Sequence, residues 1–215
     1  MKLIVVSPEV FLKDESSVLN RLFEEGLEIL HVRKPGSKKA DVEKLLQKID
    51  PEYHSRIVLH DHFSLTDQYN LKGVHLNRRN PVFIGRPGLS RSRSCHSFSE
   101  LEQCEGWDYL FLSPIFDSIS KTGYVSGFSA EELRDASNKQ IIHSKIIALG
   151  GIAGSNIAGL KTYGFGGAAV LGALWNDFQK DGDLEKMIET YNELNIKMNE
   201  MTLSIITKNA GNVKP

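Results

Sequence analysis

The chain has 215 residues, of which 40% are hydrophobic and 25% are charged, a balance typical of a globular protein with a sizeable core. This length suits one compact α/β barrel, a fold that spans ~200 to ~250 residues. The formal net charge of −1 gives no electrostatic basis for binding nucleic acid or an anionic membrane, so we expect neither partner.

The first ten residues, MKLIVVSPEV, are typical of a strand, because they lack the basic region and long apolar core of a signal peptide. No apolar run reaches the ~20 residues of a membrane span, so we expect a cytoplasmic protein. Cys95 and Cys104 fall at a predicted strand end and in the next predicted helix. We expect both to be reduced thiols rather than a disulfide.

Short β-branched or apolar runs alternate along the chain with segments of helical spacing. The predicted strands are Leu3–Val6, Ile29–Val32, Ile57–Leu59, Gly73–Leu76, Leu89–Cys95, Tyr109–Leu112, Ile146–Leu149 and Ala168–Leu171. The predicted helices are Ser17–Glu25, Lys39–Ile49, Phe98–Glu105, Ala130–Ser137, Asn156–Tyr163 and Leu184–Asn199. This alternation implies right-handed parallel crossovers, and eight units predict an α/β fold of the closed (β/α)8 TIM-barrel type. A doubly wound open sheet is the alternative.

Two connections are short. Little more than SLTDQYN separates the third strand from the fourth, and residues 77–88 have no helical period, so we expect a single compact domain with some shortened helices. We assign residues 1–207 to the barrel and residues 208–215 to a polar, frayed tail. The sequence is compatible with a homo-oligomer as well as with a monomer.

Polar residues gather at the carboxyl ends of the predicted strands, where such barrels place their active sites. They are His31, Arg33, His60, Asp61, His62, His75, Asn77, Ser94, His96 and Ser113. Residues two apart on a strand share a face, so His31 and Arg33 form one pair and Ser94 and His96 another. His60 and His62 form a His-x-His pair that could bind zinc, although without further ligands this is a weak motif.

Two segments predict anion binding. Ser118, Ser120 and Lys121 follow the sixth strand, and their hydroxyl and ammonium groups suit a phosphate. Three glycines at the ends of the seventh and eighth strands, Gly150, Gly151 and Gly172, let backbone amides approach a ligand, at the positions where barrels frequently bind phosphate. The structural alternative for the first segment is a solvated surface loop. For the glycines it is the need for tight turns.

The fifth strand contains LSRSRSCHS, and the roles of Arg91 and Arg93 stay open at this point. Cys95 and His96 are neighbours on a strand and point to opposite faces, so we expect Cys95 to be a buried, inert thiol rather than a nucleophile.

These motifs together resemble the family of thiamine phosphate synthases and TenI-like proteins, which includes thiazole tautomerases. The resemblance runs from the first strand to Trp175. DYLFLSPIFDSISK is similar to the family's DYxGxGPxxxTxTK, HVRKPG to QxRxK, IVLHD to a strand ending in Asn-Asp, GVHLNRRN to GxHxGQxD, RSCHS to SxH, and IALGGI to the closing glycine loop. The resemblance implies a (β/α)8 barrel and a pocket for a phosphorylated thiazole.

The chain departs from the synthase pattern at four positions. Asp61 matches one of two aspartates that hold Mg²⁺ in the synthase, but Asn80 stands in place of the second. His60 replaces an asparagine, Pro35 a lysine, and Gly172 a serine that binds diphosphate. Fewer charged ligands weaken the binding of both Mg²⁺ and diphosphate. Lys34 is a candidate substitute for the missing lysine, but neighbouring positions aim differently.

From these departures we predict a TenI-like thiazole tautomerase, which moves a proton on a thiazole phosphate and needs no metal. His96 is the predicted proton carrier, because a reference pKa near ~6.5 suits proton transfer at neutral pH. The predicted substrate-binding and phosphate-binding residues are Arg33, His60, Ser94, Ser118, Ser120, Lys121, Gly150, Gly151 and Gly172.

Three alternatives remain. The first is a thiamine phosphate synthase, which joins a pyrimidine diphosphate to the thiazole phosphate with Mg²⁺ at Asp61. The second is a regulator that binds a thiamine-pathway ligand without turning it over. The third is an unrelated phosphate-sugar isomerase on the same barrel.

Overall fold

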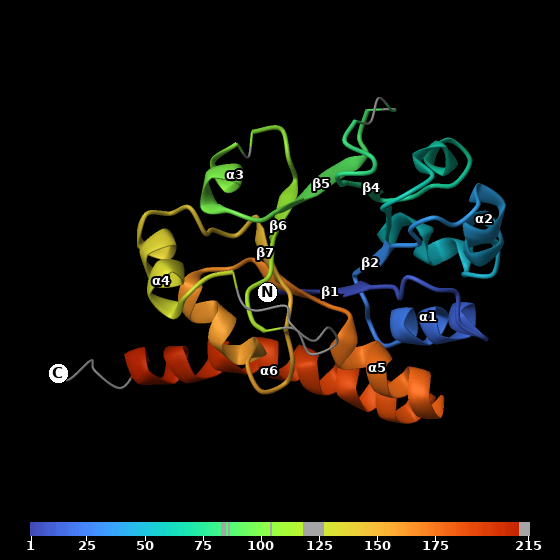
Figure 1. Cartoon of the computed structure of the whole chain (residues 1–215). Helices are drawn as coiled ribbons and strands as arrows, with labels where there is room; N and C mark the ends of the chain where they lie inside the picture. The colour runs from blue at the N-terminus through green and yellow to red at the C-terminus, as the bar shows by residue number, and fades with distance from the viewer. Residues whose placement is uncertain (83–84, 86, 104, 118–126, 211–215) are drawn as a thin grey trace.

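The strands form a closed barrel in chain order, in which each strand pairs in parallel with the next and β8 pairs with β1 (Figure 1). The computed structural model describes residues 1–82, 85, 87–103, 105–117 and 127–210, with side chains described as far as residue 199. The strands are β1 (Lys2–Val6), β2 (Ile29–Val32), β3 (Ile57–Leu59), β4 (Gly73–Leu76), β5 (Ser90–Cys95), β6 (Tyr109–Leu112), β7 (Ile146–Leu149) and β8 (Gly167–Val170). The predicted (β/α)8 barrel is confirmed, and the open sheet is excluded.

The helices surround the barrel as α1 (Glu15–Glu24), α2 (Lys39–Gln47), α3 (Phe98–Glu102), α4 (Ala130–Asn138), α5 (Gly172–Asp181) and α6 (Leu184–Ala210), with 3-10 helices η1 (Pro51–Arg56), η2 (Phe63–Asp67) and η3 (Ile157–Tyr163). Helix α4 begins with a reciprocal capping box between Ser129 and Glu132. Helix α5 was not predicted, because only Leu174 and Trp175 of its residues are buried and its apolar period is therefore weak. The division into a 1–207 barrel and a 208–215 tail stays a prediction, since α6 is described to Ala210.

The connections from β3 to β4 and from β4 to β5 are short, as predicted, and the helix between β5 and β6 is also short. A 3-10 helix alone joins β3 to β4, no helix is described among the placed residues between β4 and β5, and α3 has five residues. Arginines cover the outer face of β5 instead. Arg91 donates to Gly106 O at 3.0 Å, and Arg93 lies over the Trp107 ring at 5.1 Å and donates to Glu100 O at 2.9 Å. This packing gives Arg91 a structural role.

The apolar core has two parts. The larger lies between the barrel and its helices and includes Leu19, Leu46 and Trp175, each of which is almost fully buried. Burying one such side chain stabilises the fold by ~1.5 to ~3 kcal/mol. The smaller part fills the barrel interior with Ile4, Val6, Ile29, Val58, Tyr109, Phe111, Ile147 and Ala169. Cys95 belongs to the larger part as a free, buried thiol whose pKa is raised by burial, as expected of an inert cysteine.

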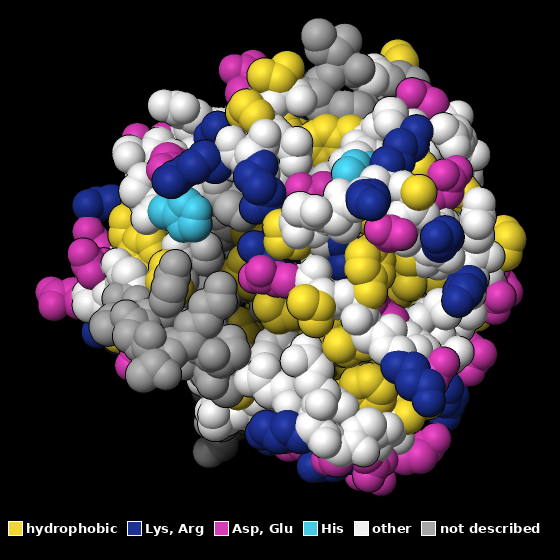
Figure 2. Space-filling view, turned by 45° about the vertical axis from the view of Figure 1, so that its right-hand side comes forward, with side chains coloured by type: hydrophobic (Ala, Val, Ile, Leu, Met, Phe, Trp, Pro, Cys, Tyr) yellow, Lys and Arg dark blue, Asp and Glu magenta, His cyan; other side chains and the backbone are white. Residues whose placement is uncertain are grey.

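Positive and negative side chains are mixed over the face of the molecule that Figure 2 presents. Such mixing agrees with the net charge near zero. Within the described residues, every helix is too short or too polar for a bilayer crossing.

Candidate active site

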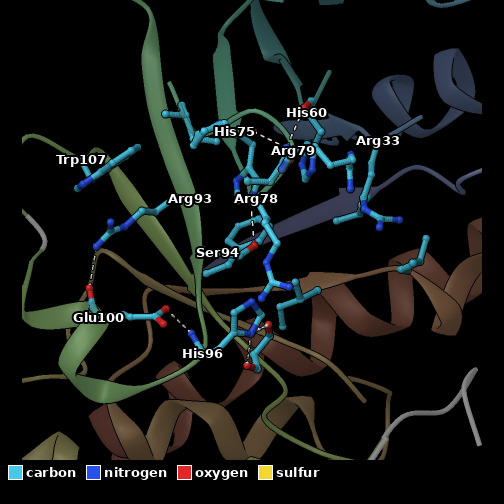
Figure 3. Close-up of a pocket in the computed structure, with 18 of the residues that line it drawn as sticks. Arg33, His60, His75, Arg78, Arg79, Arg93, Ser94, His96, Glu100 and Trp107 are labelled. Atoms are coloured by element: carbon cyan, nitrogen blue, oxygen red, sulfur yellow. Dashed lines mark hydrogen bonds between the residues drawn. The ribbon is translucent and has the colours of Figure 1, made fainter. Parts of the chain in front are cut away.

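A pocket of about 610 Å³ opens at the carboxyl ends of the strands. Arg33, His60, Ser94 and His96 line it, so the structure brings together four of the residues predicted from the sequence. Figure 3 shows Arg33, His60 and Arg79 near one end of the pocket and His96 and Glu100 near the other. The pocket therefore has two chemically different ends.

The first end is rich in arginine. Arg33 pairs with Glu9 at 2.7 Å, and Arg78 and Arg79 follow β4 and also line the pocket. Arg93 lines the same pocket. Several guanidinium groups within one pocket suit a ligand with several negative charges, because arginine binds phosphate oxygens through charge-assisted hydrogen bonds. Arg78 and Arg79 were not predicted, since the loop that carries them has no regular period.

Asp61 and Asn80 lie side by side at this end. Asn80 Nδ2 donates to Asp61 Oδ1 at 3.0 Å, and Arg79 approaches the same carboxylate oxygen at 3.2 Å. The two positions that match the synthase metal ligands are therefore adjacent. A carboxylate and a carboxamide oxygen are hard ligands of the kind that Mg²⁺ prefers.

Lys34 does not replace the lysine that is missing at Pro35. Its ammonium group is fully buried and lies 2.7 and 2.8 Å from the two Glu15 carboxylate oxygens, and it also donates to Pro8 O and Val10 O at 2.8 Å. Burial lowers the pKa of Lys34 and raises that of Glu15, while their attraction opposes both shifts. This ion pair fixes the loop after β1, and neither of its residues lines the pocket.

The barrel interior beneath the pocket contains three buried histidines. His31 Nδ1 lies 2.8 Å from His60 Nε2, and His31 Nε2 lies 2.7 Å from the Tyr109 hydroxyl. His75 Nδ1 and Nε2 each lie 2.9 Å from a serine hydroxyl, those of Ser92 and Ser94. Burial lowers the pKa of all three rings well below the usual range, to about 3 for His75, so each ring is neutral near pH 7.

These three rings are near enough for a shared metal ion, since one ring nitrogen of each lies within 4.8 Å of the others. Their orientation does not suit one. His60 and His75 are stacked, with centroids 4.2 Å apart and planes 19° apart, and a metal lies in the plane of each ring that binds it. Both nitrogens of His31 and of His75 already have hydrogen-bond partners. We therefore interpret the cluster as a hydrogen-bonded network.

His60 and His62 do not form the His-x-His pair that the sequence allowed as a weak motif. His62 has a left-handed backbone with φ of 56°, so it has left the strand geometry that would place it on the same face as His60. Its Nε2 lies 2.8 Å from Ser37 O, whereas His60 contacts His31.

His96 lies at the second end of the pocket. Its Nδ1 is 3.0 Å from Ser113 O, and its backbone N–H donates to the Glu100 carboxylate at 2.8 Å. A carbonyl oxygen can only accept, so Nδ1 carries the proton and Nε2 keeps a free lone pair. This ring can act as a base toward a ligand in the pocket.

The glycine loop after β7 packs tightly against the loop after β6. Gly150 and Gly151 have φ of 97° and 63°, and a Cβ on Gly151 would lie 2.2 Å from Asp117 O. Asn156 closes the turn by accepting from Ala153 N at 2.9 Å and donating to Gly151 O at 2.8 Å. Close packing is thus sufficient reason for both glycines, and a role in phosphate binding stays a prediction, as it does for Gly172 at the start of α5.

Ser118, Ser120 and Lys121 lie outside the described residues, so their predicted role in phosphate binding is not tested. The network residues Ser92 and Tyr109 were not predicted as part of the site. The alternation of β5 could have identified Ser92, because it shares a face with Ser94.

Comparison with known proteins identifies relatives over most of the chain. The family described as "Thiamine monophosphate synthase" matches residues 3–174. The thiamine-phosphate synthase of Leuconostoc citreum is 24% identical over 189 residues, covering 80% of this chain and 84% of that protein. The synthase of Listeria innocua is 28% identical over 176 residues, covering 74% and 80%.

Solved structures extend this likeness. The crystal structure of thiamine phosphate pyrophosphorylase from Bacteroides thetaiotaomicron is 44% identical and covers 92% of this chain and 97% of that chain, with a TM-score of 0.82. The thiamine phosphate pyrophosphorylase from Pyrococcus furiosus, at 23% identity, covers 93% and 96% with a TM-score of 0.70 and supports the fold alone.

Proposed function

Because the chain belongs to the thiamine monophosphate synthase family, a family of thiamine-biosynthesis enzymes, we propose that it joins a pyrimidine diphosphate to a thiazole phosphate. The products are thiamine phosphate and diphosphate. The relatives favour this synthase activity over the tautomerase activity that the sequence departures suggested. The substrates are small phosphorylated molecules.

The observation that carries the proposal is that Arg33, Arg78 and Arg79 line one pocket and that Arg79 pairs with Asp61. A diphosphate leaving group has more negative charge than a single phosphate, and Arg33, Arg78 and Arg79, which all line the pocket, supply compensating charge. In this proposal the thiazole phosphate binds in the same pocket, which His96 also lines.

The donor set also fits Mg²⁺, although it offers one carboxylate fewer than the family pattern. Asp61 would hold the ion through its carboxylate oxygens, and Asn80 would join it only after turning its amide, because its Nδ2 donates to Asp61 and to His60 O; when bound, the ion would neutralise charge on the diphosphate. The chain's own contribution is positional. Arg33 and Arg79 bind and orient the diphosphate so that the carbon it leaves faces the thiazole nitrogen.

The test incubates purified protein with pyrimidine diphosphate, thiazole phosphate and Mg²⁺, and follows thiamine phosphate. We expect product with both substrates present and none when either is omitted. Arg33→Ala should lower kcat/KM by ten- to hundredfold, the effect of ~1.5 to ~3 kcal/mol from a hydrogen bond to a charged group. Arg91→Ala on the outer face of β5 is the matched control and should retain activity. Equal loss in both variants would contradict the role of Arg33.

The tautomerase activity remains a second candidate because of the free lone pair on His96 Nε2. A separate assay offers the thiazole carboxylate tautomer and follows its aromatic isomer. There, His96→Ala should lower the rate by ~10² to ~10⁴ and leave phosphate affinity nearly unchanged. His143→Ala, at the opposite end of β7, is the control. Retained turnover in His96→Ala would remove His96 as the proton carrier.

If neither assay forms product and thiazole phosphate binds tightly, the result would instead support a regulatory protein that binds the ligand without turnover. The two assays therefore separate the three functions that the sequence left open.

A further inference from the structure

The carboxylate of Asp61, which would hold a divalent cation, is already paired with Arg79. Arg79 Nη2 donates to Asp61 Oδ1 at 3.2 Å and to Oδ2 at 3.4 Å, and Arg79 Nε donates to Oδ1 at 3.4 Å. Asn80 Nδ2 is a further donor to Oδ1 at 3.0 Å. Both carboxylate oxygens therefore accept hydrogen bonds from the loop after β4.

Arg79 also lies nearer to the pocket than Asp61 does. Arg79 is one of the described residues that line the pocket, and Figure 3 shows it there, whereas Asp61 is not one of them. The side chain of Arg79 is 44% exposed and that of Asp61 only 11%. A cation that enters through the pocket therefore meets the guanidinium group before it reaches the carboxylate.

A divalent cation and a guanidinium group compete for this carboxylate. Mg²⁺ and Mn²⁺ bind carboxylate oxygens directly and require further oxygen ligands around them. A guanidinium group within 3.4 Å of both oxygens would place two positive charges side by side, and charges repel strongly at short separation. Binding of the cation therefore requires Arg79 to leave Asp61.

The loop allows the side chain of Arg79 to move while its backbone stays in place. Arg79 N donates to Asn77 Oδ1 at 3.0 Å, and Asn80 N donates to Asn77 O at 3.0 Å. These bonds hold the backbone of the turn, but the exposed part of the Arg79 side chain is free to rotate about its own bonds. Phosphate oxygens in the pocket would offer the guanidinium group a second set of acceptors, beside Arg33.

We propose that the Arg79 side chain exchanges between Asp61 and an anion in the pocket, and that it leaves Asp61 when a divalent cation binds there. The inference rests on the proposed function, because that reaction uses both a divalent cation and a diphosphate. It gives Arg79 a role that differs from those of Arg33 and Arg78. Arg79 would link the two binding events.

This exchange makes the two ligands bind cooperatively. A cation at Asp61 releases Arg79 for the anion, and an anion withdraws Arg79 from Asp61, so each ligand raises the affinity for the other by the same factor. Direct contact between cation and anion also couples their binding, but that coupling survives when Arg79 is replaced. The part that depends on Arg79 therefore measures the exchange.

The first experiment measures the dissociation constant of Mn²⁺ alone from the signal of free Mn²⁺ in electron paramagnetic resonance. Arg79→Met removes the competing group and should tighten Mn²⁺ binding about five- to tenfold, as expected for the loss of a partly exposed ion pair. Methionine has no oxygen or nitrogen ligand in its side chain, so it adds no ligand that a hard cation prefers.

Arg78→Met is the matched control. It removes the same charge from the neighbouring position, whereas the hydrogen bonds to the Asp61 carboxylate come from Arg79 and Asn80. Mn²⁺ binding should change by less than about twofold, because a charge without direct contact is largely screened. Asp61→Asn should abolish this Mn²⁺ binding.

The second experiment repeats the Mn²⁺ titration with saturating inorganic phosphate as the anion. Phosphate should tighten Mn²⁺ binding in the wild type and in Arg78→Met, and the factor should be at least about threefold smaller in Arg79→Met. An equal factor in all three proteins would overturn the exchange.

Three results of the first experiment would also overturn it. They are unchanged Mn²⁺ affinity in Arg79→Met, equal tightening in Arg78→Met and Arg79→Met, and Mn²⁺ binding that survives Asp61→Asn. Neither experiment contains a pyrimidine or a thiazole, so both are separate from turnover. The expected Mn²⁺ pattern without thiamine phosphate formation would count against the proposed function alone, and product formation without that pattern would count against the exchange alone.

Discussion

The two halves of the barrel interior differ in chemistry. Strands β2, β4 and β5 contribute His31, His75 and Ser92, whereas β1, β7 and β8 contribute apolar side chains such as Ile4, Ile147 and Ala169. Side chains in the apolar half need only fill space, but those in the polar half each need a partner of matching donor or acceptor character. The difference suggests that the apolar half supports the barrel while the polar half serves the pocket above it.

The largest expected contrast between the halves is the response to acid. The pKa values of His31, His60 and His75 are lowered mainly by burial, from 6.5 to about 3 for His75. The unfolded chain therefore binds more protons as the pH falls, and stability is full above pH ~6.5 and lost below it. At pH 4, His75 alone should cost roughly 3 kcal/mol. Urea unfolding between pH 7 and 4 measures this.

His31→Gln is the variant for that experiment, because an amide can bond to both neighbours without titrating. It should flatten the fall in stability at low pH. A wild-type stability that is constant from pH 7 to pH 4 would show that the rings are not held neutral.

The next effect concerns the apolar half. Ile147 is 2% exposed within the barrel interior, so Ile147→Ala should leave a cavity and cost ~2 to ~5 kcal/mol. This loss should not change with pH, in contrast to losses in the polar half. Urea unfolding at pH 7 and pH 5 checks both statements, and a cost below ~1 kcal/mol would mean that the interior collapses around the missing atoms.

The smallest effect is the loss of one hydroxyl from the polar half. Tyr109→Phe keeps the ring but leaves Nε2 of buried His31 without its partner, so we expect a cost of ~1 to ~3 kcal/mol. Tyr69→Phe removes a half-buried hydroxyl that bonds to Glu43 at 3.3 Å, and its cost should be smaller. If thermal unfolding showed equal losses of stability for both variants, the buried Tyr109 hydroxyl would contribute no more than the half-buried Tyr69 hydroxyl.

The sequence was sufficient for the barrel and for much of the pocket rim. Strand and helix alternation predicted the closed barrel, and the polar strand ends located Arg33, His60, Ser94 and His96. These features depend on local periodicity, which a single sequence displays directly.

Other features depend on geometry that periodicity does not contain. His62 leaves the strand with a positive φ, which moves its side chain away from His60. The contact between His31 and Tyr109 joins residues 78 positions apart, and the alternation in each strand shows only that each faces inward. Arg91 covers a face of β5 that a longer crossover helix would normally cover.

The substitutions at Asn80, Pro35 and Gly172 favour a tautomerase only when each position is considered apart from its surroundings. Asn80 is one carboxylate fewer than the family pattern, but its chain neighbours Arg78 and Arg79 add positive charge to the pocket. Their contribution became visible only when the loop after β4 was placed next to Asp61.

The most direct test of the proposed synthase activity follows free diphosphate by ³¹P NMR in a mixture of protein, pyrimidine diphosphate and Mg²⁺. We predict negligible release until thiazole phosphate is added, then release in equal amount to thiamine phosphate. Failure to release diphosphate with both substrates present, or release that does not depend on the thiazole, would contradict the account.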